Sequence, residues 1–156
     1  MRKLLIGVAI VMSWVVAMSA SAQTVDKKTL SFEAAMKIAT KAAEEARARG
    51  VGVVIAVVDD GGHLILLHRL NDTQVASVNV GIGKARTAAI YRRPSRDFEE
   101  QIRAGRVAAL ALADSTPLQG GIPIRLDGKV IGAIGVSGDT PQVDEAIALA
   151  GAAAFK

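Results

Sequence analysis

Two pairs of apolar segments, each interrupted by turn residues, run through the chain and predict two β-hairpins. In the first pair, residues 51–69, the turn residues 59–62 separate strands rich in β-branched residues and leucine. In the second pair, residues 120–139, Asp127-Gly128 forms the turn signal, because glycine tolerates the positive φ that a two-residue turn requires. The pattern of apolar and polar positions therefore predicts at least four strands.

The two strands of the second hairpin differ in character. Simple alternation from the turn pairs three positions across it, namely Leu126 with Lys129, Ile124 with Ile131, and Ile122 with Ala133. The first strand contains Pro123 and Arg125, whereas the second is apolar on both sides, so we expect the first at a sheet edge and the second inside. Small side chains at Ala133, Gly135 and Ser137 leave a strip where a helix, another subunit or a flat ligand can approach the backbone. Packing is the favoured interpretation of that strip.

Apolar positions spaced three and four apart predict helices before, between and after the hairpins. Their expected starts and ends are Ser31 to Gly50, Thr73 to Tyr91, Ser95 to Gly105, a short stretch over 106–114, and a last helix from Thr140 and Pro141. Their expected inner positions are Ala35, Met36, Ala39, Ala42, Ala43 and Ala46; Val75, Val78, Ile82, Ala85 and Ala89; Phe98 and Ile102; and Val143, Ile147, Ala150 and Ala154.

The order of these elements indicates the fold class. Hairpins separated by helices, rather than alternating strand and helix units, favour a mostly antiparallel sheet with helices packed on it. We therefore expect an α+β fold, in a single domain of ordinary size.

The amino-terminal residues have the pattern of a secretory signal. Arg2 and Lys3 precede an apolar run over 4–18, and Ala20-Ser21-Ala22 provides the small residues that a signal peptidase requires. The alternative, an uncleaved membrane anchor, is less favoured because the run is short. We expect a cleaved signal peptide over 1–22, a flexible arm over 23–29 and a domain over 30–156, in a periplasmic or secreted protein.

Composition narrows the classes of function. The chain has no cysteine, which excludes disulfides, thiolate ligands and cysteine nucleophiles. Its formal net charge of +4 falls to +2 without Arg2 and Lys3, and acidic and basic residues are interspersed. Nothing in that charge distribution predicts nucleic-acid binding.

Motifs that carry chemistry are few. Gly81, Gly83 and Lys84 lie inside a helical pattern, so they do not form a phosphate-binding loop. His63 and His68 are five residues apart and point to opposite faces of a regular strand, so they can share one ion only if a bulge lies between them. Ser137, His68 and Asp59 have the residue types of a catalytic triad, but the sequence does not place the three together. No strand-turn-helix elbow, which would expose a nucleophilic serine, surrounds any serine. No catalytic residue is predicted.

Four motifs in order resemble one known family. They are GKARTAA over 83–89, RPSRDF over 93–98, PLQGGIPI over 117–124 and GAIGVSG over 132–138. The chain resembles the GlcG/HbpS family, which includes the C-terminal domain of PduO-type proteins, across nearly all of residues 30–155. The resemblance implies a profilin-like sandwich of about five antiparallel strands, assembled into oligomers that are often octamers. It also implies heme binding in some members and a membrane sensor kinase as the partner of others, while GlcG is associated with glycolate utilisation.

The family resemblance and the small residues around the second hairpin, which would leave backbone open to a ligand, together indicate candidate ligand contacts. They are His68, Lys84, Thr87, Arg93, Thr116, Gly120, Gly121, Gly135 and Ser137, with His63 as a further possible contact. Lys84 and Arg93 would neutralise propionates or another anion. The alternative is that both are solvent-facing charges on a helix surface. Heme-binding relatives of the PduO branch offer a histidine from the first helix, and the helix 31–49 has none. The ExxE iron-binding pattern associated with HbpS is absent as well.

The sequence and the resemblance therefore predict an exported sensor or carrier that binds heme, another tetrapyrrole or a different small anionic ligand. Small-residue faces on the first and last helices, together with the resemblance, predict that it is an oligomer. Two alternatives stay open. One is an accessory enzyme that acts on a small organic acid or a corrinoid-type substrate, with Lys84, Thr87 and Ser137 in its pocket. The other is a structural assembly protein.

Overall fold

The computed structural model describes residues 23–155, which form a four-stranded antiparallel sheet with helices on both faces. The strands are β1 (Val54–Asp59), β2 (Leu64–Arg69), β3 (Gly121–Leu126) and β4 (Lys129–Ser137), in the spatial order β2-β1-β4-β3. The expected α+β class is confirmed, with four strands in the described part rather than about five. The predicted signal peptide over 1–22 lies outside the described residues.

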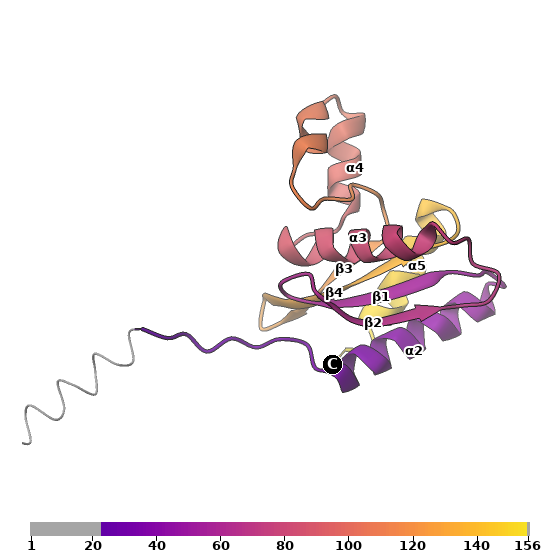
Figure 1. Ribbon diagram of the computed structural model, residues 1–156, viewed down its shortest axis with the longest axis horizontal. Coiled ribbons are helices and arrows are strands. Elements are labelled where there is room, and N and C mark those ends of the chain that lie inside the picture. The colour runs from indigo at the N-terminus through magenta and orange to yellow at the C-terminus, as the bar shows by residue number, and fades with distance from the viewer. Residues whose placement is uncertain (1–22, 156) are drawn as a thin grey trace, which may run out of the picture.

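Helices cover both faces of the sheet (Figure 1). Helices α2 (Phe32–Ala48) and α5 (Pro141–Ala152) pack together on one face, where the larger apolar core includes Ile38, Ile55 and Ile147. Helix α3 (Ser77–Ile90) covers the other face through small residues such as Ala85 and Ala88. The sheet is therefore the middle of three layers.

The two central strands are apolar on both faces because helices cover each face. In β1, residues 54–58 are all fully buried, and β4 is buried from Ile131 to Ser137. Strand β3, with Pro123 and Arg125, lies at one edge, as expected, and β2 lies at the other. Proline and a charged side chain are tolerated at an edge because one side of that strand makes no ladder hydrogen bonds.

A bulge alters the expected register of the second hairpin. Leu126 pairs with Lys129 as predicted, but Arg125 pairs with Val130 and Ile124 with Gly132, so Ile131 is the extra residue. The predicted pairs of Ile124 with Ile131 and Ile122 with Ala133 are wrong for this reason. Beyond the bulge, Ile122 pairs with Ile134 on the α2 face, while Ala133 faces α3.

Local sequence signals place most helix ends correctly. The Ser31 hydroxyl accepts the Ala34 amide at 3.2 Å, and the Thr140 hydroxyl accepts the Val143 amide at 3.4 Å, as capping residues do. Gly50 follows α2 with φ of +70°, the left-handed conformation favoured by glycine.

Several inner positions differ from those expected. Met36 and Val75 are exposed, and Ile38 takes the inner position in α2. In α5 the buried residues include Asp144 and Glu145, which the sequence placed near the helix start only as charges suited to its dipole. Helix α3 starts at Ser77 and not at Thr73, whose hydroxyl donates to the Leu70 carbonyl instead.

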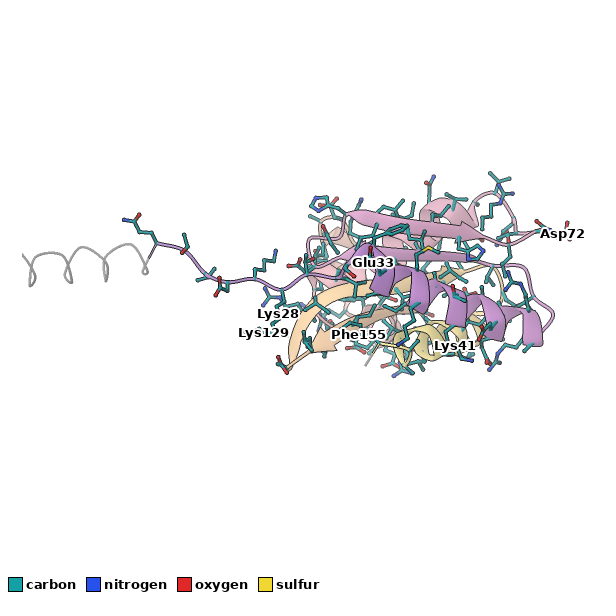
Figure 2. All side chains as sticks on the ribbon, turned by 90° about the horizontal axis from the view of Figure 1, so that it is seen from below. Lys28, Glu33, Lys41, Asp72, Lys129 and Phe155 are labelled. Carbon is teal, nitrogen blue, oxygen red and sulfur yellow. The ribbon has the colours of Figure 1, made fainter. Side chains whose placement is uncertain are left out.

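Residues 96–118 project from the sandwich as a small lobe (Figure 1). The lobe contains α4 (Arg96–Arg103) and the 3-10 helix η1 (Val107–Ala111), which replaces the helix expected over 106–114. Val107 and Leu110 are exposed on it. At the amino-terminal end of the described residues, Figure 2 shows the arm over 23–29 extending beyond the sandwich, and Lys27 of that arm pairs with Asp60 at 2.5 Å. Glu33 and Lys41 are exposed on α2 (Figure 2).

No helix within residues 23–155 has the length and apolar character needed to cross a membrane.

Candidate functional site

The candidate contacts predicted from the sequence lie on opposite faces of the sheet. Lys84 and Thr87 belong to α3, and Gly121 and Gly135 lie beneath that helix. His68 pairs with Ile55, and paired residues share one face of the sheet. Because the Ile55 side chain is in the core beneath α2, the His68 imidazole lies on the α2 face, opposite to α3. A single chain therefore does not bring the whole predicted set together.

Lys84 forms a buried ion pair that joins α3 to α5. Its Nζ lies 2.8 Å from Asp144 Oδ2 and donates to the Val136 carbonyl at 3.0 Å. The two side chains are only 5% and 3% exposed. The sequence left two interpretations of Lys84 open, a contact to an anionic ligand and a solvent-facing charge. In the single chain Lys84 is neither, because it is buried and paired with Asp144.

Asp144 is held in place by more than the lysine. Its Oδ1 accepts the Asp139 amide at 3.1 Å. Burial raises the pKa of the Asp144 carboxyl, while the hydrogen bond and the charge of Lys84 oppose that rise. Lys84 and the Asp139 amide thus both favour the ionised form of this carboxyl group.

A second acidic residue of α5 fixes the segment before β3. Glu145 Oε2 accepts hydrogen bonds from Arg96 at 3.0 Å and from the Gln119 amide group at 2.5 Å. Glu99 accepts the Gln119 backbone amide at 2.7 Å. These contacts attach the lobe to the sandwich.

Two hydroxyl groups hold the segment over 116–121 that leads into β3. Thr87 Oγ1 donates to the Gly83 carbonyl at 2.8 Å and accepts the Thr116 amide at 2.7 Å. Ser95 Oγ accepts the Gly121 amide at 2.8 Å and donates to the Leu118 carbonyl. We call Lys84, Thr87, Ser95, Gln119, Asp144 and Glu145 the polar clamp. Within one chain its members bond to one another and to the backbone.

The strip of small residues over 133–137, together with the neighbouring Gly120 and Gly121, is covered by protein. A Cβ at Gly121 would collide with the backbone of Lys84, and one at Gly135 would collide with the backbone of Gly81 and Ala85 in α3. A Cβ at Gly120 would approach Lys84 Nζ to 3.1 Å. The favoured packing interpretation is therefore confirmed, and the backbone there is not exposed as the ligand interpretation required. Ser137 is also buried, on the same face.

Arg93 lies apart from the polar clamp. Its guanidinium stacks 4.0 Å from the centre of the Phe98 ring, and Tyr91 packs edge-on against that ring. It therefore supports the base of the lobe and does not join Lys84 in one anion site.

The two histidines have different surroundings. His63 is in the turn between β1 and β2, 82% exposed in its side chain, with Nδ1 3.3 Å from Asp59 Oδ2. His68 is half-buried on β2 and makes no side-chain hydrogen bond within residues 23–155. Ser137 is on the opposite face of the sheet from His68, so the triad of Ser137, His68 and Asp59 considered from the sequence does not form. The described residues contain no cluster of three histidines and acidic residues that suits a metal ion.

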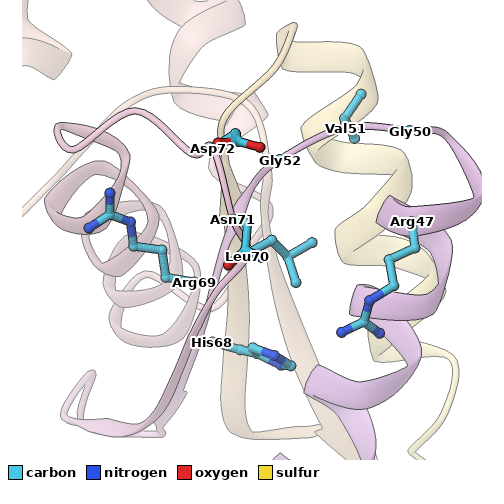
Figure 3. Close-up of a pocket in the computed structure, with 9 residues that line it drawn as sticks. All are labelled: Arg47, Gly50, Val51, Gly52, His68, Arg69, Leu70, Asn71 and Asp72. Carbon is cyan, nitrogen blue, oxygen red and sulfur yellow. The ribbon is translucent and has the colours of Figure 1, made fainter.

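A cavity of about 500 Å³ opens beside His68 (Figure 3). It is lined by Arg47, Gly50, Val51, Gly52, His68, Arg69, Leu70, Asn71 and Asp72. The Arg47 guanidinium, the Leu70 side chain and the His68 imidazole lie on the same side of β2, while Arg69 points away and donates to the Thr73 carbonyl at 3.0 Å (Figure 3). Ligand sites commonly have volumes of about 300 to 1,000 Å³.

This cavity combines three kinds of interaction. The imidazole can ligate a metal, the guanidinium can bind a carboxylate, and Leu70 and Val51 offer apolar surface. Of its residues, the sequence identified only His68. Arg47 was missed because it looked like one of several charges on the outer face of α2, and only its position at the last turn of that helix distinguishes it.

Known proteins match this chain along most of its length. The family model described as "Haem degrading protein HbpS-like" matches residues 30–153. The chain is 42% identical to Protein GlcG of Escherichia coli strain K12 over 111 residues, which is 71% of this chain and 83% of GlcG.

Two solved structures share the fold. The crystal structure of HbpS superposes with a TM-score of 0.82 at 29% identity, covering 86% of this chain and 96% of HbpS. The crystal structure of a PduOC:heme complex superposes with a TM-score of 0.75 at 26% identity, covering 82% of this chain and 96% of the other.

Proposed function

Because the chain belongs to the HbpS-like family, we propose that it binds heme, with His68 as the axial ligand. The observation that carries the proposal is the unpartnered His68 imidazole at the wall of a cavity of about 500 Å³. The heme complex of a structural relative supports the choice of ligand. The histidine that PduO-type relatives offer from the first helix has no counterpart in α2, and His68 would replace it from β2, beside that helix.

The residues of the cavity fit the chemistry of heme. A neutral imidazole nitrogen is a good ligand for iron, and His68 has no competing hydrogen bond within the described chain. Leu70 and Val51 provide apolar contact for the macrocycle, and the open side of the cavity leaves its edge near solvent. When bound, the heme would supply the redox and oxygen chemistry, while the protein would contribute the ligand, the charge and the apolar wall.

The cellular role we propose is that of an exported sensor or carrier. The charged start and the Ala20-Ser21-Ala22 site support export. Exposed apolar residues on the lobe and on α2, such as Val107 and Phe32, support assembly into an oligomer. A membrane sensor as partner follows from the family resemblance alone.

Hemin titration tests the binding proposal. The mature protein should give a Soret band shifted from that of free hemin, with saturation at one heme per chain. His68→Ala should lose the imidazole-ligated spectrum, whereas His63→Ala should retain it, because His63 is in an exposed turn away from the cavity. An unchanged spectrum in the His68→Ala protein, with the fold intact by circular dichroism, would remove His68 from the site.

A further inference from the structure

We infer that Arg47 recognises a carboxylate of the ligand, so that the cavity selects anionic, carboxylate-bearing planar molecules whether or not they contain a metal. This inference rests on the proposed function, since it concerns the same cavity. It assigns the selectivity for charge to a residue separate from the proposed metal ligand.

Arg47 differs from most arginines of the described chain in having no partner. Its side chain makes no hydrogen bond or ion pair within residues 23–155. Other arginines pair with acidic side chains, namely Arg49 with Glu45, Arg96 with Glu145 and Arg103 with Glu99. Three donate to backbone carbonyl groups, namely Arg69 to Thr73, Arg86 to Gly62, and Arg125 to Arg92 and Gly128. Arg106 bonds to the Gln101 side chain, and Arg93 stacks on the Phe98 ring. A guanidinium whose donors are all available can bind a carboxylate through two parallel hydrogen bonds.

The place of Arg47 in α2 favours a cation at this wall of the cavity. It lies in the last turn of the helix, where the unpaired carbonyl groups carry partial negative charge. Arg49, two residues further on, is already engaged by Glu45 at 2.7 Å and is not part of the cavity lining. The free positive charge of this helix end therefore belongs to Arg47.

Arg47 and His68 approach the cavity from different elements. Arg47 comes from α2 and His68 from β2, and the apolar Leu70 side chain lies on the same side of β2 as both (Figure 3). The carboxyl group of Asp72, the one acidic residue of the lining, lies away from both (Figure 3). A flat ligand in contact with Leu70 can thus place a carboxylate at Arg47 and its centre at His68 without meeting a fixed negative charge there.

Metal-free porphyrins separate the two roles. We would measure binding of mesoporphyrin IX and of its dimethyl ester, in the same dilute non-ionic detergent, to the wild-type protein and to Arg47→Met and Arg49→Met. The wild type should bind the free acid about tenfold to a hundredfold more tightly than the ester, as one charge-assisted contact warrants. Arg47→Met should remove that difference by weakening binding of the free acid, whereas Arg49→Met, the matched control on the same helix, should preserve it. His68→Ala should still prefer the free acid.

The outcomes distinguish this inference from the proposed function. Equal binding of acid and ester by the wild type, or an equal loss in both arginine variants, would overturn the role of Arg47 while hemin binding stands. A wild-type protein that binds neither hemin nor mesoporphyrin would overturn both proposals. Thermal unfolding monitored by circular dichroism checks that Arg47→Met is folded, as expected for an exposed side chain.

Discussion

Replacing Lys84 by Met should reduce stability strongly, because it removes the cation that pairs with the buried Asp144 carboxylate. Methionine has about the length of the lysine stem, so the change removes charge and leaves most of the volume filled. Breaking a buried ion pair by removing one partner costs about 3 to 5 kcal/mol. For a domain of this size that corresponds to a fall in Tm of roughly 10 to 20 °C.

The loss should depend on pH in a defined direction. Without Lys84, only backbone hydrogen bonds such as that from the Asp139 amide still oppose the effect of burial, so the pKa of the Asp144 carboxyl rises further above that of the unfolded chain. The native variant then holds a proton that the unfolded chain releases, so its free energy of unfolding falls as the pH rises through that window. The difference from wild type should therefore be smaller near pH 5 than at pH 7.

Urea unfolding at both pH values measures these effects, and the double variant Lys84→Met/Asp144→Leu is the matched control. Replacing both partners by apolar groups removes the unpaired charge, so the double variant should recover much of the lost stability. A loss below about 1 kcal/mol in the single variant would show that the pair is not buried as described. A double variant as unstable as the single one would show that packing, and not charge, causes the loss.

Two further predictions concern processing and assembly. The mature protein should begin at Gln23, because Ala20-Ser21-Ala22 suits signal peptidase; mass spectrometry of the cellular protein checks this, and an intact 1–22 segment would contradict it. Light scattering at micromolar concentration should give a mass well above that of one chain, because apolar side chains including Val107 and Leu110 stay exposed in the single chain. Charged substitutions at both residues should lower that mass, and a stable monomer in the wild type would refute the expectation.

The basis of the assembly prediction differs from that expected from the sequence. The small-residue faces of the first and last helices, which suggested close approach between subunits, pack against each other and the sheet within one chain. Ala42 and Ile147 are fully buried there. Spacing along a helix reveals that a face is small and apolar, but it does not say which neighbour covers it.

Much of the fold could be predicted from local patterns. The hairpin turn at Asp127-Gly128, the caps at Ser31 and Thr140, and the edge position of the strand with Pro123 each depend on a few neighbouring residues. The family followed from ordered motifs along the chain and the α+β class from the order of hairpins and helices, and both are confirmed. The bulge at Ile131 could not be predicted, because an extra residue in a strand depends on how both faces pack.

The candidate site divides in the same way between sequence and tertiary structure. By itself the sequence determined the family, the order of the elements and the identity of the few residues with useful chemistry, because these depend on residue type and local spacing. Tertiary structure alone decided that Lys84 meets Asp144, sixty residues away, that α3 covers Gly135, and that Arg47 and His68 line one cavity. These contacts join segments far apart in the chain, and their free energy depends on burial and on the pairing of charges, which exist only once the layers are packed.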